Sequence, residues 1–589
     1  MKIQLTSLIS ILLFSSADIT AGATSTPKCR CLPTEPCWPS AAAWKALNVS
    51  IDGNLVAVRP FAHVCHDPTY NSDECQTAKR MSNESLWLSA NPGAVQTANW
   101  ASLPLRNETC YVNSAQFVSC GQGRISLYSA VVRKPAHIQA AVRFIKKHNV
   151  RLAIKNTGHC YLGRSVAPDS LQILTHNLKG IEFVDDFKPK GCSNDTGYGS
   201  AVTMGAGVQL KELYTTLGER NLTAVLGAAH TVGAAGGYIQ GGGHSPLGPW
   251  KGMAADNALE FTVVTAKGQV VVANDFQNSD LFWALRGGGG GSWGVVSSVT
   301  IRTFPDPPTA VQSLAISSAN DTAFWDFVEE FHAKLPAVND AGGSGYYFLT
   351  AAAPGNISTL IIGLFFAGHT NDTIMAEVMD PLLEYANLTL GSSSVVASRF
   401  QAPAFKYVIN EILPRDSDTG GATVHLGSRL VSRDFLSRRA GATKLTAALK
   451  KAFAPGIGAG GSFTGHLVAG GQVARNAELN VAVNPAWRRT VTHLVGGVSW
   501  SQNATVEEQL EVERRVTEEM VPLLAELEPD MGAYLNEADA FEQNFQRSFW
   551  GDNYPRLREV KKRWDPEGIF ITRAGVGSED WDEEGLCRV

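Results

Sequence analysis

The stretch Arg151-Leu-Ala-Ile-Lys-Asn-Thr-Gly-His159-Cys-Tyr-Leu-Gly-Arg-Ser165 decides the fold. It begins as a short apolar strand, Leu152 to Ile154, and then changes to small, turn-forming residues. The backbone N–H groups of such a turn can point into one space and form a nest for a pyrophosphate. One imidazole, that of His159, lies in the middle. The pattern predicts a cofactor that is held by its phosphates and within reach of a covalent bond to the histidine. An ordinary polar loop with a surface histidine is the alternative.

A second stretch, residues 227–245, contains too many glycines for a regular helix or strand. It reads Gly227-Ala-Ala-His-Thr-Val-Gly-Ala-Ala-Gly-Gly-Tyr-Ile-Gln-Gly-Gly-Gly-His-Ser245. Glycine lets the backbone approach a ligand closely and adopt positive φ. A strand-like run at residues 260–266 and five consecutive glycines, residues 287–291, follow it. This second loop favours the cofactor interpretation over an ordinary polar loop.

Together these stretches resemble the FAD-linked oxidases of the berberine-bridge-enzyme-like group, within the vanillyl-alcohol-oxidase and PCMH-type flavoproteins. The sequence looks most like their secreted fungal members, including isoamyl alcohol oxidase-like proteins. The matching pieces occur in the family's order and span most of the mature chain: Asn156–His159, Gly241–Gly243, Ala255–Asn257, Asp280–Gly288, Trp550–Leu557 and Trp564–Pro566. The resemblance implies an α+β fold, with a two-lobed PCMH-type FAD-binding domain and a substrate domain built on an antiparallel sheet.

The composition limits the possible partners and the compartment. A chain of 589 residues is too long for one core, so two large lobes are expected. A net charge of −5 and the lack of a basic run argue against nucleic acid and anionic membranes. Residues 1–23 predict a secretory signal, with Lys2, an apolar run at residues 5–14 and a small-residue cleavage site. The apolar run is too short to span a bilayer, and no later segment is long enough.

The cysteines and glycosylation sequons agree with secretion. Seven of the ten cysteines lie between Cys29 and Cys120, which predicts a disulfide-stapled N-terminal segment of undetermined connectivity. The pair Cys29 and Cys31 has no second pair at zinc spacing, so we predict no metal site. Ten Asn-x-Ser/Thr sequons predict a glycosylated surface: Asn48, Asn83, Asn107, Asn194, Asn221, Asn320, Asn356, Asn371, Asn387 and Asn503. Nothing in the sequence indicates the oligomeric state.

The chain divides into five predicted parts. They are a signal peptide at residues 1–23, a Cys-rich cap at 24–122, the FAD-binding domain at 123–305, the substrate domain at 306–543, and a C-terminal segment at 544–589 that returns to the FAD domain. A strand within residues 124–132, a helix from Pro135 and the strand at 152–154 predict a βαβ unit. A helix is expected at residues 210–218 and a hairpin through Lys267-Gly268.

The resemblance assigns the cofactor-binding residues. It implies that His159 is bonded to the 8α-methyl carbon of FAD, with a purely hydrogen-bonding histidine as the alternative. Many relatives have a second bond from a cysteine shortly before Thr-Val-Gly. Residues 227–233 contain no cysteine, so a single attachment is predicted. The predicted cofactor-binding residues are Lys155, Asn156, Thr157, Gly158, His159, Cys160, Tyr161, Ser165, Gly227, Thr231, Val232, Gly233, Gly236, Gly237, Gly241, Gly242, Gly243, Asn257, Asn553 and Tyr554.

Three residues are predicted to be catalytic. His244 follows the triple glycine, where plant relatives commonly have tyrosine, and an imidazole is a suitable base near neutral pH. A structural histidine in a tight loop is the alternative. By resemblance Tyr534 and Tyr554 line the site near the flavin, although both could be core residues with a hydrated hydroxyl. No base in the substrate domain can be matched.

The predicted reaction is oxidation of an alcohol-type small molecule by hydride transfer to FAD, with O2 reduced to H2O2. In the family a bulky residue after Thr-Val-Gly is associated with poor oxygen reactivity, and Ala234 and Ala235 are both small. A flavin dehydrogenase or oxidative cyclase of a secondary-metabolite pathway is the first alternative. A secreted glycoprotein that has lost the chemistry is the second, and the intact loop around His159 argues against it.

Overall fold

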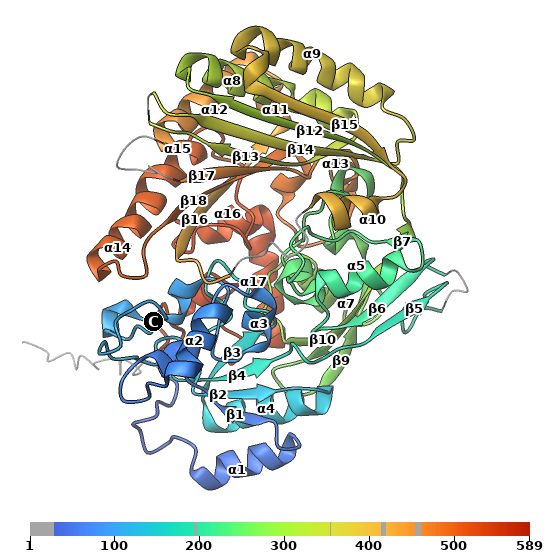
Figure 1. Ribbon diagram of the computed structural model, residues 1–589. Coiled ribbons are helices and arrows are strands. Elements are labelled where there is room, and N and C mark those ends of the chain that lie inside the picture. The colour runs from blue at the N-terminus through green and yellow to red at the C-terminus, as the bar shows by residue number, and fades with distance from the viewer. Residues whose placement is uncertain (1–28, 194–196, 354, 414–419, 454–460) are drawn as a thin grey trace, which may run out of the picture.

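The protein folds into two lobes, and the upper lobe of Figure 1 is made of elements between β12 (Thr309–Ser318) and α15 (Val521–Ala525). The computed structural model describes residues 29–193, 197–353, 355–413, 420–453 and 461–589. The predicted signal peptide and the sequon at Asn194 lie outside these residues. Both lobes combine helices with sheets, and the upper sheet is antiparallel. The predicted α+β fold class is therefore confirmed.

A small sheet of the lower lobe presents the His159 loop. Its strand order is β1-β2-β4-β3, and β4 is parallel to both β2 and β3. The predicted βαβ unit is present, but β4 lies between its two strands, so they are not neighbours. Helix α4 connects β2 to β3 and buries Ile138, Ala141, Val142 and Ile145. The elements are β1 (Leu55–Ala57), β2 (Tyr128–Val131), α4 (Pro135–His148), β3 (Arg151–Lys155) and β4 (Ser170–Leu174).

A second, five-stranded antiparallel sheet lies beside it with the order β5-β6-β10-β8-β9. Strands β8 and β9 form the predicted hairpin, and Gly268 takes the positive φ of 68° that its turn requires. Helix α5 (Leu210–Gly218) has the predicted bounds. The strands are β5 (Ile181–Val184), β6 (Ala201–Gly205), β8 (Ala258–Val264), β9 (Val270–Ala273) and β10 (Val295–Arg302).

The upper lobe is a seven-stranded antiparallel sheet with helices on one face (Figure 1). The strand order is β15-β12-β14-β13-β17-β18-β16. The strands are β12 (Thr309–Ser318), β13 (Gly343–Thr350), β14 (Ser358–Ala367), β15 (Val395–Ala402), β16 (Val424–Ser432), β17 (Ser462–Leu467) and β18 (Thr490–Ser499). The helices are α8 (Asp321–Asp340), α9 (Thr373–Leu390), α12 (Arg439–Ala452), α14 (Val506–Arg515) and α15 (Val521–Ala525). The sequence did not predict β12, β15 or β17.

Strand alternation gives this sheet two different faces. Tyr347 is fully buried in the core beneath the helices, whereas its neighbour Tyr346 belongs to the core of the lower lobe. A π-helical turn at Val516–Met520 separates α14 from α15. No helix among the described residues is long and apolar enough to cross a bilayer.

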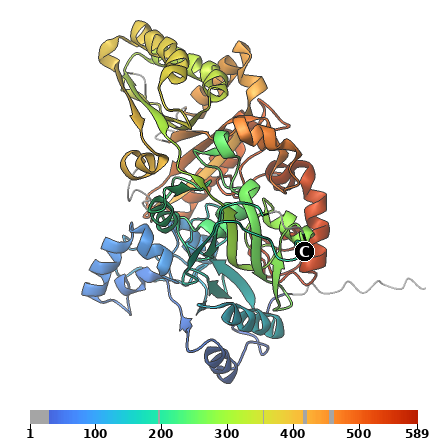
Figure 2. The ribbon, with the colours of Figure 1, turned by 90° about the vertical axis from the view of Figure 1, so that its right-hand side faces the viewer.

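The N-terminal segment wraps the lower lobe and is disulfide-bonded, as predicted. It contains α1 (Ala41–Ser50), α2 (Ser72–Met81) and α3 (Ser85–Ala90). Its disulfides are Cys31–Cys37, Cys65–Cys75 and Cys110–Cys120, and Cys29–Cys587 joins the two ends of the described chain. The C-terminus accordingly lies against the lower lobe in Figures 1 and 2.

The last segment packs on the lower lobe after the chain has left the upper one. Helices α16 (Phe545–Trp550) and α17 (Tyr554–Trp564) lie beside α7 (Ser279–Leu285), and Trp550 Nε1 donates to Gly287 O at 3.1 Å. Arg488, which lies just before β18 in the chain, also contacts the lower lobe. Its guanidinium donates two hydrogen bonds to Asp256, at 2.7 and 2.8 Å. Both side chains of this pair are buried.

The Arg488–Asp256 pair predicts a test of stability. Asp256→Asn leaves a buried guanidinium without its countercharge, so the free energy of unfolding should fall by about 3–5 kcal/mol. The matched control is Asp530→Asn, because Asp530 pairs with Arg547 at 2.7 Å on the exposed surface. Its loss should cost less than about 1 kcal/mol. Urea unfolding of both variants checks this, and equal losses would contradict the structural role of the buried pair.

Candidate active site

A cavity of about 300 Å³ lies where the two glycine-rich stretches meet the uncovered face of the upper sheet. Several parts of the chain supply its walls. Residues within 156–165 and 227–240 form much of the lower wall, and the segment from Gly290 to Val296 adds to it. Tyr346 and His466 supply the sheet side, and Tyr534, Asn536 and Glu537 come from the segment before α16. Both predicted loops therefore line one space.

The N-terminal segment holds the His159 loop in place. Gln96 N donates to Gly158 O at 3.3 Å, and Trp100 Nε1 donates to Tyr161 O at 2.7 Å. Gly158 has a φ of 84°, which a side chain would strain. The His159 ring is hydrogen-bonded to Thr231, with 2.6 Å between His159 Nε2 and Thr231 Oγ1. The imidazole is thus fixed between two loops that are far apart in the sequence.

Asn156 and Gly233 bring the two loops into close contact. Asn156 Nδ2 donates to Thr175 Oγ1 at 2.9 Å and to Ala206 O at 2.5 Å. A Cβ on Gly233 would overlap Asn156 Oδ1. The loops therefore need glycine at this point.

Two buried oxygens in the cavity indicate a ligand with hydrogen-bond donors. Asn156 Oδ1 and Gln240 Oε1 are buried and have no hydrogen-bond partner among the described residues, and both side chains line the cavity. Buried polar atoms are normally satisfied, so a bound group is expected to donate to them. The ring N–H and ribityl hydroxyls of a flavin are such donors. The residues present therefore fit a flavin.

The structure brings together most of the residues predicted for the site. Those lining the cavity are Asn156, Thr157, Gly158, His159, Cys160, Tyr161, Ser165, Gly227, Val232, Gly233, Gly236, Gly237, His244 and Tyr534. Thr231 does not line it but contacts His159. Asn536, which the resemblance places at the site in one segment with Tyr534, also lines it, and so do Arg164 and Glu537, which were not predicted.

Lys155 does not face the cavity. Its ammonium is buried in the N-terminal segment, and Nζ donates to Leu88 O at 2.8 Å and to Asn91 O at 2.5 Å. Burial lowers the pKa of Lys155 to about 7. The prediction that it binds the cofactor is corrected, because strand alternation turns this side chain away from the cavity.

Tyr554 and two predicted asparagines also lie outside the cavity. The hydroxyl of Tyr554 donates to Glu579 at 2.5 Å, and burial raises its pKa. Asn257 donates to Lys251 O and Met253 O, and Asn553 donates to Val483 O, so both amides hold turns. The prediction of Tyr554 as a catalytic residue is corrected on this geometry.

The triple glycine packs against protein and does not line the cavity. A Cβ on Gly241 would overlap the amide of Asn536, and one on Gly243 would lie 2.8 Å from the Cβ of Ala254. These glycines let residues 241–243 turn tightly and bring His244 to the cavity wall. Their predicted contact with the cofactor stays a prediction.

A row of three polar side chains crosses the face of the upper sheet that carries no helices and faces the lower lobe. Tyr346 on β13 pairs directly with His466 on β17, and His466 pairs directly with His493 on β18. Directly opposed residues of antiparallel strands point to the same face. The two Nδ1 atoms of His466 and His493 are 3.3 Å apart. The sheet register therefore places two buried imidazoles side by side.

Glu537 and His244 complete this cluster from the lower side. His244 Nε2 lies 3.1 and 3.3 Å from the Glu537 oxygens, and Glu537 Oε2 lies 3.4 Å from His466 Nδ1 and 3.7 Å from His493 Nδ1. Burial alone would raise the pKa of Glu537, but His244 and His466 lower it below its usual value. Burial lowers the pKa of His466 and of His493 well below 6.5. Glu537 is therefore a carboxylate beside two sheet histidines whose burial disfavours a positive charge.

Aromatic rings and one amide surround the cluster. The Tyr534 ring lies 5.3 Å from that of His244 and 5.5 Å from that of Trp487. Asn536 Nδ2 donates to the Tyr534 hydroxyl at 2.7 Å, and Arg164 donates to Asn536 Oδ1 at 2.9 Å. Burial raises the pKa of Tyr534, so its hydroxyl stays protonated. The site thus contains a carboxylate, a protonated tyrosine hydroxyl, and the guanidinium of Arg164 held on Asn536.

Local sequence patterns scarcely indicated His466, His493 and Glu537 as site residues. They lie on β17, on β18 and in the segment before α16. Strand pairing and the return of the chain to the lower lobe bring these segments together. The only local signal was a histidine inside each of two largely apolar strands, His466 in Ser462–Leu467 and His493 in Thr490–Ser499. Such a histidine is more often a core residue than a ligand, so the signal is weak on its own.

Comparisons with known proteins agree with this geometry. The family model described as "FAD binding domain" matches residues 127–274, and the one described as "Berberine and berberine like" matches residues 533–577. An uncharacterized FAD-linked oxidoreductase of Arthroderma benhamiae is 51% identical over 98% of this chain and 98% of its own. The FAD-linked oxidoreductase malF of Malbranchea aurantiaca is 40% identical, over 95% of this chain and 94% of its own.

Solved structures agree as well. A VAO-type flavoprotein from Myceliophthora thermophila shares the fold with a TM-score of 0.85 and 32% identity, over 95% of this chain and 100% of its own. Berberine bridge enzyme shares the fold alone, with a TM-score of 0.63 and 18% identity over 91% of this chain and 99% of its own. The chain belongs to the berberine-bridge-enzyme-like family of FAD-linked oxidoreductases.

Proposed function

We propose that this FAD-linked oxidoreductase oxidises a small-molecule alcohol and passes the electrons to O2, which forms H2O2. The observation that carries the proposal is the carboxylate of Glu537 with its three histidines in the cavity that His159 also lines. Bound FAD supplies the acceptor for the hydride that leaves the substrate carbon. The protein must then deal with the hydroxyl proton, and this cluster is the group in the cavity suited to that task.

Each part of the site has a proposed role. His244 and Glu537 face the substrate hydroxyl and stabilise the loss of its proton. Tyr534, which stays protonated, donates a hydrogen bond to the substrate oxygen. Asn156 and Gln240 accept hydrogen bonds from the cofactor through their unpaired oxygens. The apolar part of the substrate lies on the uncovered face of the upper sheet, beside Tyr346.

His159 is proposed to hold the cofactor covalently. In the tautomer whose Nε2–H donates to Thr231, the lone pair of the ring lies on Nδ1, which is the atom proposed to bond to the 8α carbon. Ala228 and Ala229 line the cavity where a second, thiol attachment would be expected, and neither offers sulfur. A single attachment is therefore proposed.

Secretion is also proposed. Four disulfides among the described residues are typical of an oxidising compartment. Most of the described sequon asparagines are exposed, as glycosylation requires: Asn83, Asn107, Asn221, Asn320, Asn356, Asn371, Asn387 and Asn503.

The first prediction of the proposal concerns the reductive reaction. Mixed anaerobically with a panel of alcohols, hydroxy acids and sugars, the protein should lose its flavin absorbance with at least one alcohol. Glu537→Gln removes the carboxylate and should slow this reduction about 10²–10⁴-fold. Tyr554→Phe is the control, because Tyr554 lies outside the cavity, and it should keep the wild-type rate. Bleaching by no alcohol, or an unchanged rate in Glu537→Gln, would refute the proposed chemistry.

The next prediction concerns the attachment through His159. Acid-precipitated wild-type protein should keep its flavin in the pellet, whereas His159→Ala should release it to the supernatant. Cys160→Ser is the matched control, because Cys160 is a thiol outside the disulfides that lines the same cavity. It should retain the flavin.

Peptide mapping by mass spectrometry should then find one flavin-bearing peptide, and fragmentation should place the flavin mass on His159. Release of all flavin from the wild type would end the covalent proposal. Flavin mass on Cys160, or on two linked peptides, would end the single attachment.

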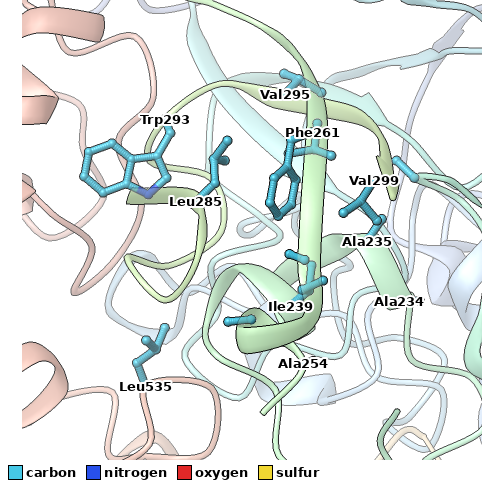
Figure 3. Close-up of a cluster of buried hydrophobic side chains, with 14 of the residues drawn as sticks. Ala234, Ala235, Ile239, Ala254, Phe261, Leu285, Trp293, Val295, Val299 and Leu535 are labelled. Atoms are coloured by element: carbon cyan, nitrogen blue, oxygen red, sulfur yellow. The ribbon is translucent and has the colours of Figure 1, made fainter. Parts of the chain in front are cut away.

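The third prediction of the proposal concerns O2. Ala235 is buried and lines the cavity, and Figure 3 shows it with Ala234 in a cluster of apolar side chains beside Val299. The methyl group of alanine leaves room for a small apolar gas. In so closely packed a wall, a leucine side chain would fill that room. Ala235→Leu should slow reoxidation by air about 10-fold or more and leave anaerobic reduction largely unchanged.

Ala234→Leu is the control, because Ala234 is as deeply buried as Ala235 but does not line the cavity. Stopped-flow mixing of the reduced proteins with oxygenated buffer measures both rates. Wild-type reoxidation no faster than that of free flavin would favour the dehydrogenase over the oxidase.

A further inference from the structure

The four groups of the histidine–glutamate cluster lie at distances typical of metal ligands. His244, His466, His493 and Glu537 each offer one atom, and these atoms all lie within 4.8 Å of one another. In a tetrahedral site with bonds of about 2.0–2.1 Å to zinc, neighbouring ligand atoms are about 3.3–3.4 Å apart. The measured separations of Glu537 from the three rings are 3.1, 3.4 and 3.7 Å, and the two sheet histidines are 3.3 Å apart.

Hydrogen bonds satisfy this arrangement poorly. His466 Nδ1 faces both Glu537 Oε2, which only accepts, and His493 Nδ1. With Nδ1 protonated on both rings, each ring can donate to the carboxylate, but the separations of 3.4 and 3.7 Å are long for such bonds, and the two N–H groups meet at 3.3 Å. With either Nδ1 unprotonated, that ring faces the carboxylate with a lone pair. A cation between the four atoms turns each nitrogen lone pair into a ligand.

Glu537 faces the three histidines of the cluster. Among the described residues, its ion-pair partners are His244, His466 and His493, with no lysine or arginine. Each of these three residues is at most 8% exposed. A divalent ion between them brings positive charge to a carboxylate that burial removes from water.

The ligand positions are rigid before any ion binds. His466 and His493 are fixed by directly paired positions on β17 and β18. Trp487 lies 5.7 Å from the His493 ring and 6.3 Å from the His244 ring, and Tyr346 lies 5.3 Å from the His466 ring. Packing therefore orients the rings, since His244 Nδ1 and His493 Nε2 have no hydrogen-bond partner among the described residues. Such preorganisation favours a bound metal.

We propose that His244 Nε2, His466 Nδ1, His493 Nδ1 and Glu537 bind one divalent ion of the zinc class. Three imidazoles and a carboxylate are borderline ligands of the kind that Zn²⁺ takes. His244, His466 and Glu537 line the cavity, so the ion has one open side, toward the substrate. On that open side the ion binds an oxygen of the substrate. This contact between ion and substrate rests on the proposed alcohol oxidation. The ion joins the upper sheet to the loops of the lower lobe.

Metal content tests the site without reference to activity. The protein is produced with a tag that lacks histidine, in medium supplemented with Zn²⁺, and its metal is measured by mass spectrometry after gel filtration. Wild-type protein should hold about one Zn²⁺ per chain, the number of ligand sets in the cluster. His493→Ala and Glu537→Gln each remove a direct ligand and should each weaken Zn²⁺ binding about 100-fold or more. Loss of a direct ligand costs at least as much metal affinity as loss of an outer-shell hydrogen-bond partner.

His425→Ala is the matched control, because His425 is buried on the neighbouring strand β16 and pairs with Asp539, outside the cluster. It should keep its zinc. The flavin spectrum of each variant shows whether it has folded. Zinc retained by both cluster variants, or lost equally from the His425 control, would overturn the assignment.

Co²⁺ provides a second measurement on the unaltered protein. Added to chelator-treated wild type, Co²⁺ should give the visible absorption of a tetrahedral or five-coordinate nitrogen-ligated site, at wavelengths beyond the flavin bands. It should titrate to one equivalent and vanish on addition of Zn²⁺. Wild-type protein with no such absorption and no stoichiometric zinc would overturn the metal site, even if alcohols still bleach the flavin.

Discussion

The close contact between Asn156 and Gly233 is the constraint on which the site depends. It joins the loop after β3 to the glycine-rich loop after α5, and no side chain fits at Gly233. This contact sets the separation between His159 and Thr231, and with it the orientation of the imidazole. The N-terminal segment holds the same loop from the other side through Gln96 and Trp100. The disulfides of that segment therefore contribute to the site, although they lie outside it.

The second requirement is that the two lobes stay in register. The chemistry proposed here needs His244 from the lower lobe beside His466 and His493 from the upper sheet, with Glu537 from the returning chain between them. The buried pair of Arg488 and Asp256 fixes a neighbouring point of the same interface. A shift of one residue in the pairing of β17 and β18 would turn a histidine to the helix-covered face. Specificity for the substrate and stability of the interface therefore depend on the same strands.

Features that depend on neighbouring residues could be predicted from local sequence patterns. Features formed by residues that are far apart in the sequence could not. Helix α5 and the turn at Gly268 were predicted because apolar periodicity and a positive-φ glycine are local properties. Lys155 was assigned to the cofactor because of its place in a motif, but the alternation of β3 turns it toward Leu88. Tyr554 was assigned by motif in the same way. The histidine–glutamate cluster could not be predicted, because its members come together only through strand register and chain return.

The account makes one central claim, that this cavity holds one flavin in the folded protein. The most direct measurement is the visible absorption spectrum of the protein after gel filtration, with protein concentration determined independently. The account predicts the two absorption bands of an oxidised flavin at one flavin per chain, the number that a single FAD-binding cavity allows. A correctly folded, colourless protein that gains no flavin bands when incubated with FAD would contradict it.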